Sequence, residues 1–168
     1  MGAPDVGPIV TARLSLQPFT SAQACDVLSG ARRPEWAEGY PTPGDVEVAT
    51  WVSNPRFGSP DARFGPRTIV VRVPGLCIGG IGFHGVPRED GTVEIGYGIA
   101  EEWRGQGLGS EAIAAFVAHA WSLPGVQRVI ATTEEDNTAS VHALLGAGLV
   151  PTPLGGGSLR FLCEAPVG

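Results

Sequence analysis

The chain has 168 residues, an apolar content of 43% and a charged content of 17%, which are ordinary values for a folded protein with a buried core. Its formal net charge of −6 argues against the basic surface that nucleic acids and anionic membranes require. Three cysteines without paired spacing, no signal-peptide pattern and no long apolar run predict a cytoplasmic protein with free thiols.

The N-terminal part predicts a strand and two helices. Residues 1–8 are rich in Gly and Pro and are expected to be flexible. The alternation of apolar residues over 11–19 is typical of a strand. Ser21 is expected to cap a helix that ends at Gly30, and Asp45 a short helix over 45–54.

The remaining elements alternate between strands and helices. The expected strands and helices are strands 67–73, 76–86 and 92–100, helix 110–123, strand 127–133, helix 137–148 and a hairpin over 149–164. Short turns should join the first three strands into an antiparallel meander, and a right-handed crossover should make strands 92–100 and 127–133 parallel. The expected fold class is therefore α/β (α+β), with a mixed sheet in a single domain over residues 1–168.

A glycine-rich turn stands between a strand and a helix, in "EEWRGQGLGSEA" (101–112). The first N–H groups of a helix lack internal partners, and the helix dipole adds positive charge there, so such a turn can bind an anion. The chain has no lysine, which excludes the Gly-Lys-Ser/Thr motif of the P-loop in nucleoside triphosphatases. The spacing G-x-G-x-G also differs from the dinucleotide fingerprint G-x-G-x-x-G.

The pattern R-G-x-G-x-G resembles the acetyl-CoA pyrophosphate loop of the GNAT N-acetyltransferase superfamily. "EIGYGIAEEWRGQGLGSEA" and "NTASVHALLGAGLV" are similar to motifs of the branch that acetylates ribosomal-protein N-termini, the RimJ/RimL type. The resemblance implies a mixed sheet of about six or seven strands, about four helices and two splayed central strands. It also implies acetyl-CoA as cofactor and direct transfer of the acetyl group to a primary amine, with no metal.

The resemblance places the cofactor on three segments. A backbone N–H near Ile99 or Ala100 should meet the negative charge that develops on the thioester oxygen. Asn137 should touch the pantetheine end of CoA, and its second interpretation as a helix cap is compatible with this. The implied cofactor residues are Ile99, Ala100, Arg104, Gly105, Gln106, Gly107, Leu108, Gly109, Ser110, Asn137 and Ser140.

Two groups are candidates for the base that deprotonates the amine. Glu94 shares a strand face with Gly96 and Gly98, which leaves room for a ligand, and its place resembles that of the catalytic glutamate of many members. Its alternative is a solvated strand carboxylate, as the glycines can also relieve crowding. His84, at the end of the neighbouring strand, is the second candidate and a candidate acceptor contact.

The sequence departs from the family at the general acid. Many members carry a tyrosine four residues before the glycine of a Gly-Phe pair, and here Leu144 stands at that place. The resemblance to the ribosomal-protein branch suggests Ser140 as the group that donates a hydrogen bond to the leaving thiolate. A thiol pKa near 8.5 makes the thiolate a tolerable leaving group.

The resemblance implies that the Pro- and Gly-rich loop 31–44 helps to wall the acceptor site. The carboxylate of Glu38 and the aromatic side chains of Trp36 and Tyr40 in this loop would suit a cationic amine. Alternatively, the two aromatic side chains pin the loop to the core. The resemblance alone slightly favours a protein or peptide N-terminus as acceptor, and a small-molecule amine, such as an amino acid, polyamine or aminoglycoside, is the alternative. A non-catalytic acyl-CoA sensor is the rival from another class. Nucleic-acid and membrane partners are not expected. The family resemblance alone suggests a homodimer.

Overall fold

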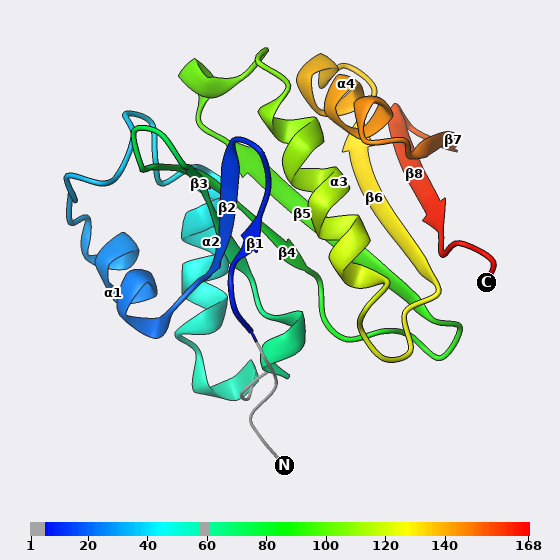
Figure 1. Ribbon diagram of the computed structural model, residues 1–168, viewed down its shortest axis with the longest axis horizontal. Helices are drawn as coiled ribbons and strands as arrows, with labels where there is room; N and C mark the ends of the chain where they lie inside the picture. The colour runs from blue at the N-terminus through cyan, green and yellow to red at the C-terminus, as the bar shows by residue number, and fades with distance from the viewer. Residues whose placement is uncertain (1–5, 58–60) are drawn as a thin grey trace.

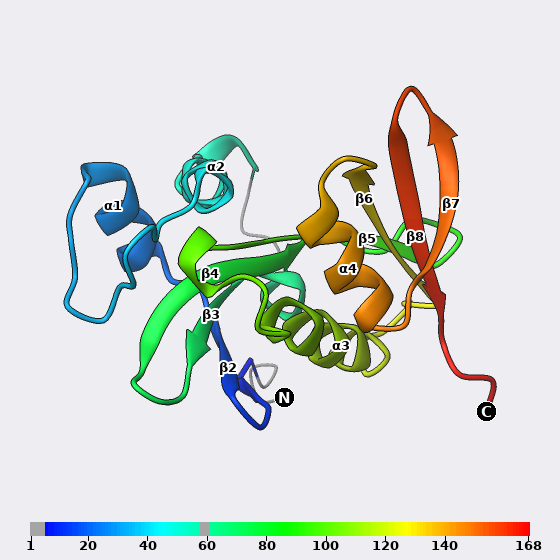
Figure 2. The same ribbon diagram turned by 90° about the horizontal axis from the view of Figure 1, so that it is seen from above.

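The computed structural model describes residues 6–57 and 61–168, in which one open mixed sheet has two α-helices on each face (Figures 1 and 2). The strands are β1 Ile9–Val10, β2 Leu14–Pro18, β3 Arg67–Val71, β4 Leu76–Phe83, β5 Thr92–Ile99, β6 Arg128–Glu134, β7 Val150–Gly155 and β8 Ser158–Glu164. The α-helices are α1 Ser21–Ser29, α2 Pro43–Val52, α3 Leu108–Ala120 and α4 Thr138–Gly146. Short 3-10 turns occupy Pro55–Phe57, Ala62–Phe64 and Glu101–Trp103. The expected fold class is confirmed.

The sheet order is β1-β2-β3-β4-β5-β6-β8-β7, and among these described strands only the neighbours β5 and β6 run parallel. The meander β3-β4-β5 and the closing hairpin β7-β8 are therefore confirmed. The sheet has eight strands, more than the six or seven expected. The additional strand β1 has two residues, too few to show a periodic pattern in the sequence. The flexibility expected for residues 1–8 falls mostly on residues 1–5, which lie outside the described residues.

Three helices begin at residues other than those expected. The cap of α1 is Thr20 rather than Ser21, and the cap of α2 is Thr42 rather than Asp45. In both helices the threonine hydroxyl accepts from the backbone N–H of the third helical residue, whose side chain accepts from the threonine N–H in return. Asp45 is that reciprocal partner in α2. Helix α3 begins at Leu108, after Gly107 in the left-handed conformation, two residues before the expected start.

The two sheet faces bury separate clusters. Helices α3 and α4 cover one face, where the rings of Phe83 and Phe116 stack with centroids 4.4 Å apart. Helices α1 and α2 lie on the opposite face (Figure 2), and a smaller cluster there contains Trp36, Tyr40 and Cys77. Among the described residues, no helix has the length and apolar character needed to cross a membrane.

Strands β5 and β6 pair only at their beginnings. Thr92, Val93 and Glu94 pair with residues 128–130 of β6. In the part of the chain that the structure describes, the five residues of β5 from Ile95 onward have no strand partner on that side. In Figure 1 the two strands diverge toward α4 and the start of α3. The splayed central strands are thus present. This gap, with the N-terminal ends of α3 and α4 beside it, positions the site described next.

Candidate active site

The glycine turn takes the chain from the end of β5 into α3. After Ala100, the 3-10 turn Glu101–Trp103 leads to Gly105 and Gly107, with φ of 74° and 76°. Backbone of this left-handed kind is readily adopted by glycine and strains other residues. These two glycines are therefore required by the path of the chain.

The turn presents a row of unoccupied donors. Among the described residues, the backbone N–H groups of residues 105–110 donate no hydrogen bond. Residues 104–107 are exposed, and the first N–H groups of α3 belong to the same row. Six consecutive donors at the positive end of a helix form a site suited to a phosphate or pyrophosphate group.

Side chains from elsewhere fix this turn. Arg13, in the β1–β2 turn, donates from Nη1 to the carbonyl of Gln106 (2.8 Å) and from Nε to Oε2 of Glu111 (2.7 Å). Oε1 of Glu111 accepts from the Thr11 hydroxyl (2.6 Å) and from the Arg13 N–H (2.8 Å). Burial alone would raise the pKa of Glu111, but these hydrogen bonds outweigh it and hold that pKa below its usual value. The sequence offered no local signal for a contact across about a hundred residues.

Gly109 and Ser110 have a second role besides their place in the donor row. The Ser110 hydroxyl donates to the carbonyl of Ala143 in α4 (3.0 Å), and a Cβ on Gly109 would stand 3.2 Å from the Ala143 methyl carbon. A Cβ on Gly146 would meet Ser110 Oγ at 2.4 Å. These small residues let α3 and α4 approach each other closely. Arg104, expected to add charge at the phosphates, also donates from Nε to the carbonyl of Ile99 (2.9 Å).

The free edge of β5 has a definite polarity. His84 N–H donates to the Glu94 carbonyl (2.8 Å) and Ala100 N–H to the Ile78 carbonyl (2.7 Å), so even-numbered residues of β5 bond to β4. Because these bonds alternate along an antiparallel pair, the backbone groups of Tyr97 and Ile99 point into the gap toward β6. Of the two expected donors for the thioester oxygen, Ala100 has its N–H occupied, and Ile99 remains.

A cavity of about 620 Å³ lies on the α2 face of β4 and β5. Its lining residues are Phe19, Thr42, Gly44, Asp45, Glu47, Val48, Trp51, Pro66, Arg67, Gly80, Ile81, Gly82, Phe83, His84, Gly85, Gly96, Tyr97 and Gly98. It reaches the stretch Gly96–Gly98 of β5, which is part of the segment that has left β6. The cavity and the gap therefore meet at one strand.

The glycines of β4 and β5 make room for polar side chains. A Cβ on Gly96 would lie 2.5 Å from Nε2 of His84, and a Cβ on Gly80 would lie 2.5 Å from Oδ1 of Asp45. Asp45 is buried, and this burial raises its pKa, although hydrogen bonds from Thr42 act in the opposite direction. His84, Asp45 and Glu47 thus place ionisable groups around a mostly apolar cavity. Among the described residues, no group of three or more acidic, His or Cys side chains could hold a metal ion.

Glu94 lies where the two strands separate, opposite Ile130 of β6. Its carboxylate accepts from the Thr132 hydroxyl (3.3 Å) and pairs with Arg88 (3.4 Å), and its side chain is 24% exposed. Of the two candidate bases, His84 lines the cavity and Glu94 stands beside the fork, two residues before Gly96.

Helix α4 presents its first turn to the other side of β5. Asn137 caps the helix, since its Oδ1 accepts from the Ser140 N–H (3.2 Å). The Tyr97 phenol lies 2.6 Å from the Ser140 hydroxyl. Leu144 is fully buried, so its side chain is part of the core. The sequence singled out Asn137 and Ser140, but the partnership with Tyr97 needed the fold.

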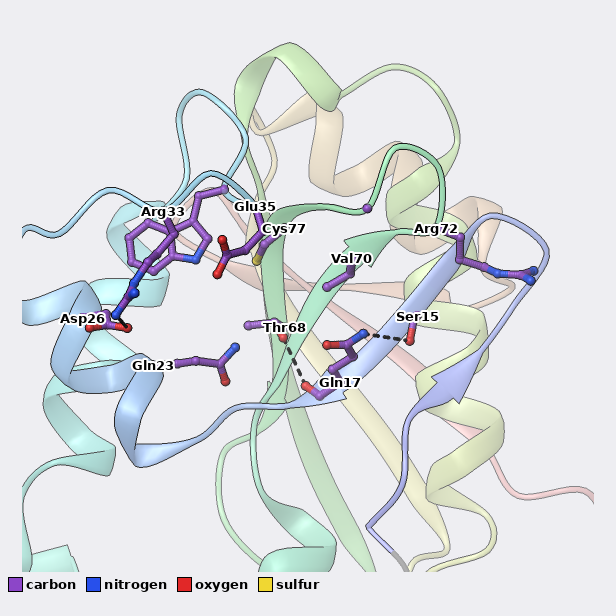
Figure 3. Close-up of a pocket in the computed structure, with 12 residues that line it drawn as sticks. Ser15, Gln17, Gln23, Asp26, Arg33, Glu35, Thr68, Val70, Arg72 and Cys77 are labelled. Atoms are coloured by element: carbon purple, nitrogen blue, oxygen red, sulfur yellow. Dashed lines mark hydrogen bonds and ion pairs between the residues drawn. The ribbon is translucent and has the colours of Figure 1, made fainter.

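The residues expected to wall the acceptor site are dispersed. A second cavity, of about 460 Å³, lies between α1 and strands β2 and β3 (Figure 3), and Trp36 lines it. Glu38 and Tyr40 line neither of these two cavities. Trp36 and Tyr40 are both buried, and their rings meet edge to face with centroids 5.2 Å apart. This burial agrees with the alternative interpretation, in which the two aromatic side chains hold the loop against the core.

Only His84 among the four expected acceptor contacts lines the cavity beside β5. Besides Phe83 of β4 and Tyr97 of β5, its aromatic lining residues are Phe19, just after β2, and Trp51, in the last turn of α2. Neither Phe19 nor Trp51 is among the expected acceptor contacts. Both look like ordinary apolar residues in the sequence. Their position depends on how α2 packs over the sheet.

Comparison with known proteins agrees with this geometry. A family model described as an acetyltransferase (GNAT) domain matches residues 13–150. Two curated relatives are the uncharacterized N-acetyltransferases p20 of Bacillus licheniformis, 31% identical over 77 residues, and YoaA of Bacillus subtilis, 42% identical over 72 residues. These matches cover 46% and 42% of this chain but only 43% and 40% of the relatives' own lengths.

A solved structure of RimL, a ribosomal L7/L12 alpha-N-protein acetyltransferase in complex with coenzyme A, superposes with a TM-score of 0.63. It is 16% identical, and the superposition covers 94% of this chain and 97% of that one. At this identity the likeness concerns the fold. The family match over most of the chain, together with the splayed strands and the glycine turn, establishes that this protein belongs to the GNAT acetyltransferase family.

Proposed function

We propose that this protein is an acetyl-CoA-dependent N-acetyltransferase that moves the acetyl group directly to a primary amine, with a protein or peptide N-terminus as the favoured acceptor. The observation that carries the proposal is the meeting of three features at β5. These are the donor row of residues 105–110, the unpaired edge from Ile95 onward and the cavity at Gly96–Gly98. The fold neighbour RimL, by its name, acts on a protein α-amine, which favours the N-terminal acceptor.

The residues present fit acetyl-CoA. The N–H groups of residues 105–110, aided by Arg104, would hold the pyrophosphate. The backbone of Tyr97 would pair with the pantetheine arm as a strand pairs with a sheet edge, since the Ile99 carbonyl already accepts from Arg104. The Ile99 N–H would stabilise the charge on the thioester oxygen. When bound, acetyl-CoA supplies the activated acetyl group, and the remaining work falls to side chains around it.

The amine would enter from the cavity on the α2 face. An α-amine has a pKa of about 7.7–8.0, so roughly a tenth of it is neutral at pH 7, and a base accepts the proton from the rest. We assign this task to Glu94, which is close to the fork but outside the cavity lining and would act through water. His84 on the cavity wall is the alternative.

A covalent acyl-enzyme is not part of the proposal. Burial raises the pKa of the Cys77 thiol to about 12 and also raises that of Cys163. Both thiols therefore stay protonated and weakly nucleophilic at neutral pH. Direct transfer needs no such nucleophile.

The test is release of CoA from acetyl-CoA with a panel of amines. The panel contains peptides with free N-termini, the same peptides with blocked N-termini, free amino acids and polyamines. We expect turnover with the free peptides and none with the blocked ones. Turnover with free amino acids or polyamines only would show that the acceptor is a small-molecule amine rather than a peptide N-terminus. Tight binding of acetyl-CoA without acetylation of any amine would establish the sensor and refute the enzyme.

Two variants assign the base. We expect Glu94→Gln to lower kcat by roughly 100-fold or more and to leave the affinity for acetyl-CoA unchanged. The control is Glu164→Gln, since Glu164 also pairs with an arginine, Arg128 (3.2 Å), but lies at the C-terminal end of β8. If Glu94→Gln keeps full turnover and His84→Gln loses it, the base is His84.

A further inference from the structure

The phenol of Tyr97 and the hydroxyl of Ser140 form one hydrogen-bonded unit. Tyr97 lies in the part of β5 that has left β6, and Ser140 lies in the first turn of α4. The phenol oxygen is 2.6 Å from Ser140 Oγ and also 3.1 Å from the Ser140 carbonyl, to which it can donate. The Ser140 N–H donates to Asn137, so both ends of the serine are fixed.

This unit has two arrangements of its protons. A serine hydroxyl has one proton and rotates freely. In the first arrangement Ser140 donates to the phenol and the phenol donates to the Ser140 carbonyl. In the second the phenol donates to Ser140 Oγ, and the serine proton turns toward a different acceptor. A negative charge beside Ser140 favours the second arrangement. In that arrangement the charge faces the Ser140 O–H, whereas in the first it faces a lone pair of Ser140 Oγ.

Burial prepares Tyr97 for the donor role. Loss of solvent raises the pKa of its phenol, and this outweighs the hydrogen bond to Ser140, which acts in the opposite direction. The phenol therefore keeps its proton at neutral pH. Leu144, where many relatives carry a tyrosine, is fully buried and has no polar group to offer.

We propose that Tyr97 is a positioning residue for the departing thiolate, directing the Ser140 proton toward the sulfur from the α4 side of β5. This inference rests on the proposed acetyl transfer. The C–S bond breaks and sulfur takes its electron pair, while the amine nitrogen bonds to the carbonyl carbon and loses its proton to the base. The Ser140 O–H donates a hydrogen bond to sulfur, and the Tyr97 O–H donates one to Ser140 Oγ. Neither proton is transferred, and water later protonates the thiolate.

In this arrangement the amine and the departing thiolate would lie on opposite faces of β5. Gly96 and Gly98 face the acceptor cavity under α2, as the contacts of their Cβ positions with His84 and Thr42 indicate. Tyr97 also borders this cavity, but its phenol lies on the opposite side of the strand, where it meets Ser140 of α4. Amine and thiolate thus occupy opposite sides of the strand.

The test compares Tyr97→Phe, Ser140→Ala and the double variant with the preferred amine. A hydrogen bond to a charged group justifies an expected fall in kcat of roughly 10- to 100-fold for each single variant. The double variant should lose no more than the worse single one, because the hydroxyls act as a unit. The KM for acetyl-CoA should stay within about twofold, since the phenol acts on departing charge rather than on binding. Ser140→Thr, which retains the hydroxyl, should restore most of the rate.

The control is Ser122→Ala, which removes a hydroxyl that donates to the His119 carbonyl beyond the far end of α3 (2.7 Å). Wild-type kcat in Tyr97→Phe, or losses that multiply in the double variant, would overturn the positioning role while leaving the acetyltransferase intact. If Tyr97→Phe does not fold, equal kcat in Ser140→Ala and Ser140→Thr overturns the role. A wild-type protein that acetylates no amine refutes the proposed function itself.

Discussion

Gly105 offers the sharpest test of the donor row, because the chain contains a matched glycine elsewhere. Gly105 has φ of 74°, and Gly30, which ends α1, has φ of 73°. A Cβ added to either would meet no atom of the described residues within 4 Å. Replacing each by alanine therefore introduces the same backbone strain in the same open surroundings. Only Gly105 belongs to the row of free N–H groups.

The expected loss of stability is about the same for both variants. Left-handed backbone costs a non-glycine residue roughly 1–2 kcal/mol, and the reduced freedom of the unfolded chain returns about 0.4–1 kcal/mol. Each variant should thus lose about 1 kcal/mol of unfolding free energy. For Gly105→Ala, relaxation of the strained turn would also misalign one donor to the pyrophosphate. A hydrogen bond to a charged group contributes about 1.5–3 kcal/mol, so the Kd for acetyl-CoA should rise roughly 10- to 100-fold.

Guanidinium unfolding curves give the first quantity, and calorimetric titration with acetyl-CoA gives the second. We expect equal unfolding free energies in the two variants and weakened binding in Gly105→Ala alone. Unchanged affinity in Gly105→Ala would refute the phosphate site. Equal loss of affinity in Gly30→Ala would show that binding follows global stability instead.

Glu111→Gln should lower the unfolding free energy by about 1 kcal/mol at pH 7 by weakening the contact with Arg13, measured by urea unfolding. The lowered pKa of Glu111 means that this stabilisation is present above the usual value of 4.5 and is lost as the pH falls through the lower folded value, so the difference between wild type and variant should shrink in acid. The pKa of His119 is lowered by burial and by nearby Arg67, and its Nε2 has no partner among the described residues. As the pH falls, the unfolded chain therefore binds a proton at His119 at a higher pH than the folded protein does. The unfolding free energy of the wild type should decrease as the pH drops below 6.5, and it should decrease more steeply than that of His119→Leu. Iodoacetamide at pH 7 should modify the exposed Cys25 and leave the buried Cys77 unmodified. Cys77→Ala should keep kcat within about twofold of the wild type, and loss of turnover in this variant would instead indicate a covalent acyl-enzyme on Cys77.

Helix starts show where local patterns reach their limit. The sequence indicated helices near Ser21 and Asp45, but Thr20 and Thr42 are the caps. Serine, threonine and aspartate all cap helices well, so neighbouring candidates compete. The reciprocal hydrogen bonds decide between them, and these depend on the path of the chain before the helix.

The sequence by itself determined the order of the elements from β2 onward and the glycine turn before α3, because periodicity and turn chemistry are local properties of the chain. Its resemblance to a family, rather than any local pattern, implied the splay at β5. It also singled out Asn137 and Ser140 at the start of α4. The tertiary structure decided which partners those residues meet. It placed Phe19 and Trp51 around the cavity beside β5, Arg13 against the glycine turn and Tyr97 against Ser140. It also gave the Ala100 N–H a partner, the Ile78 carbonyl, and gave the Ile99 N–H none among the described residues. Each of these contacts joins segments far apart in the chain, and their geometry follows from packing across the sheet and from strand register, which no local pattern records.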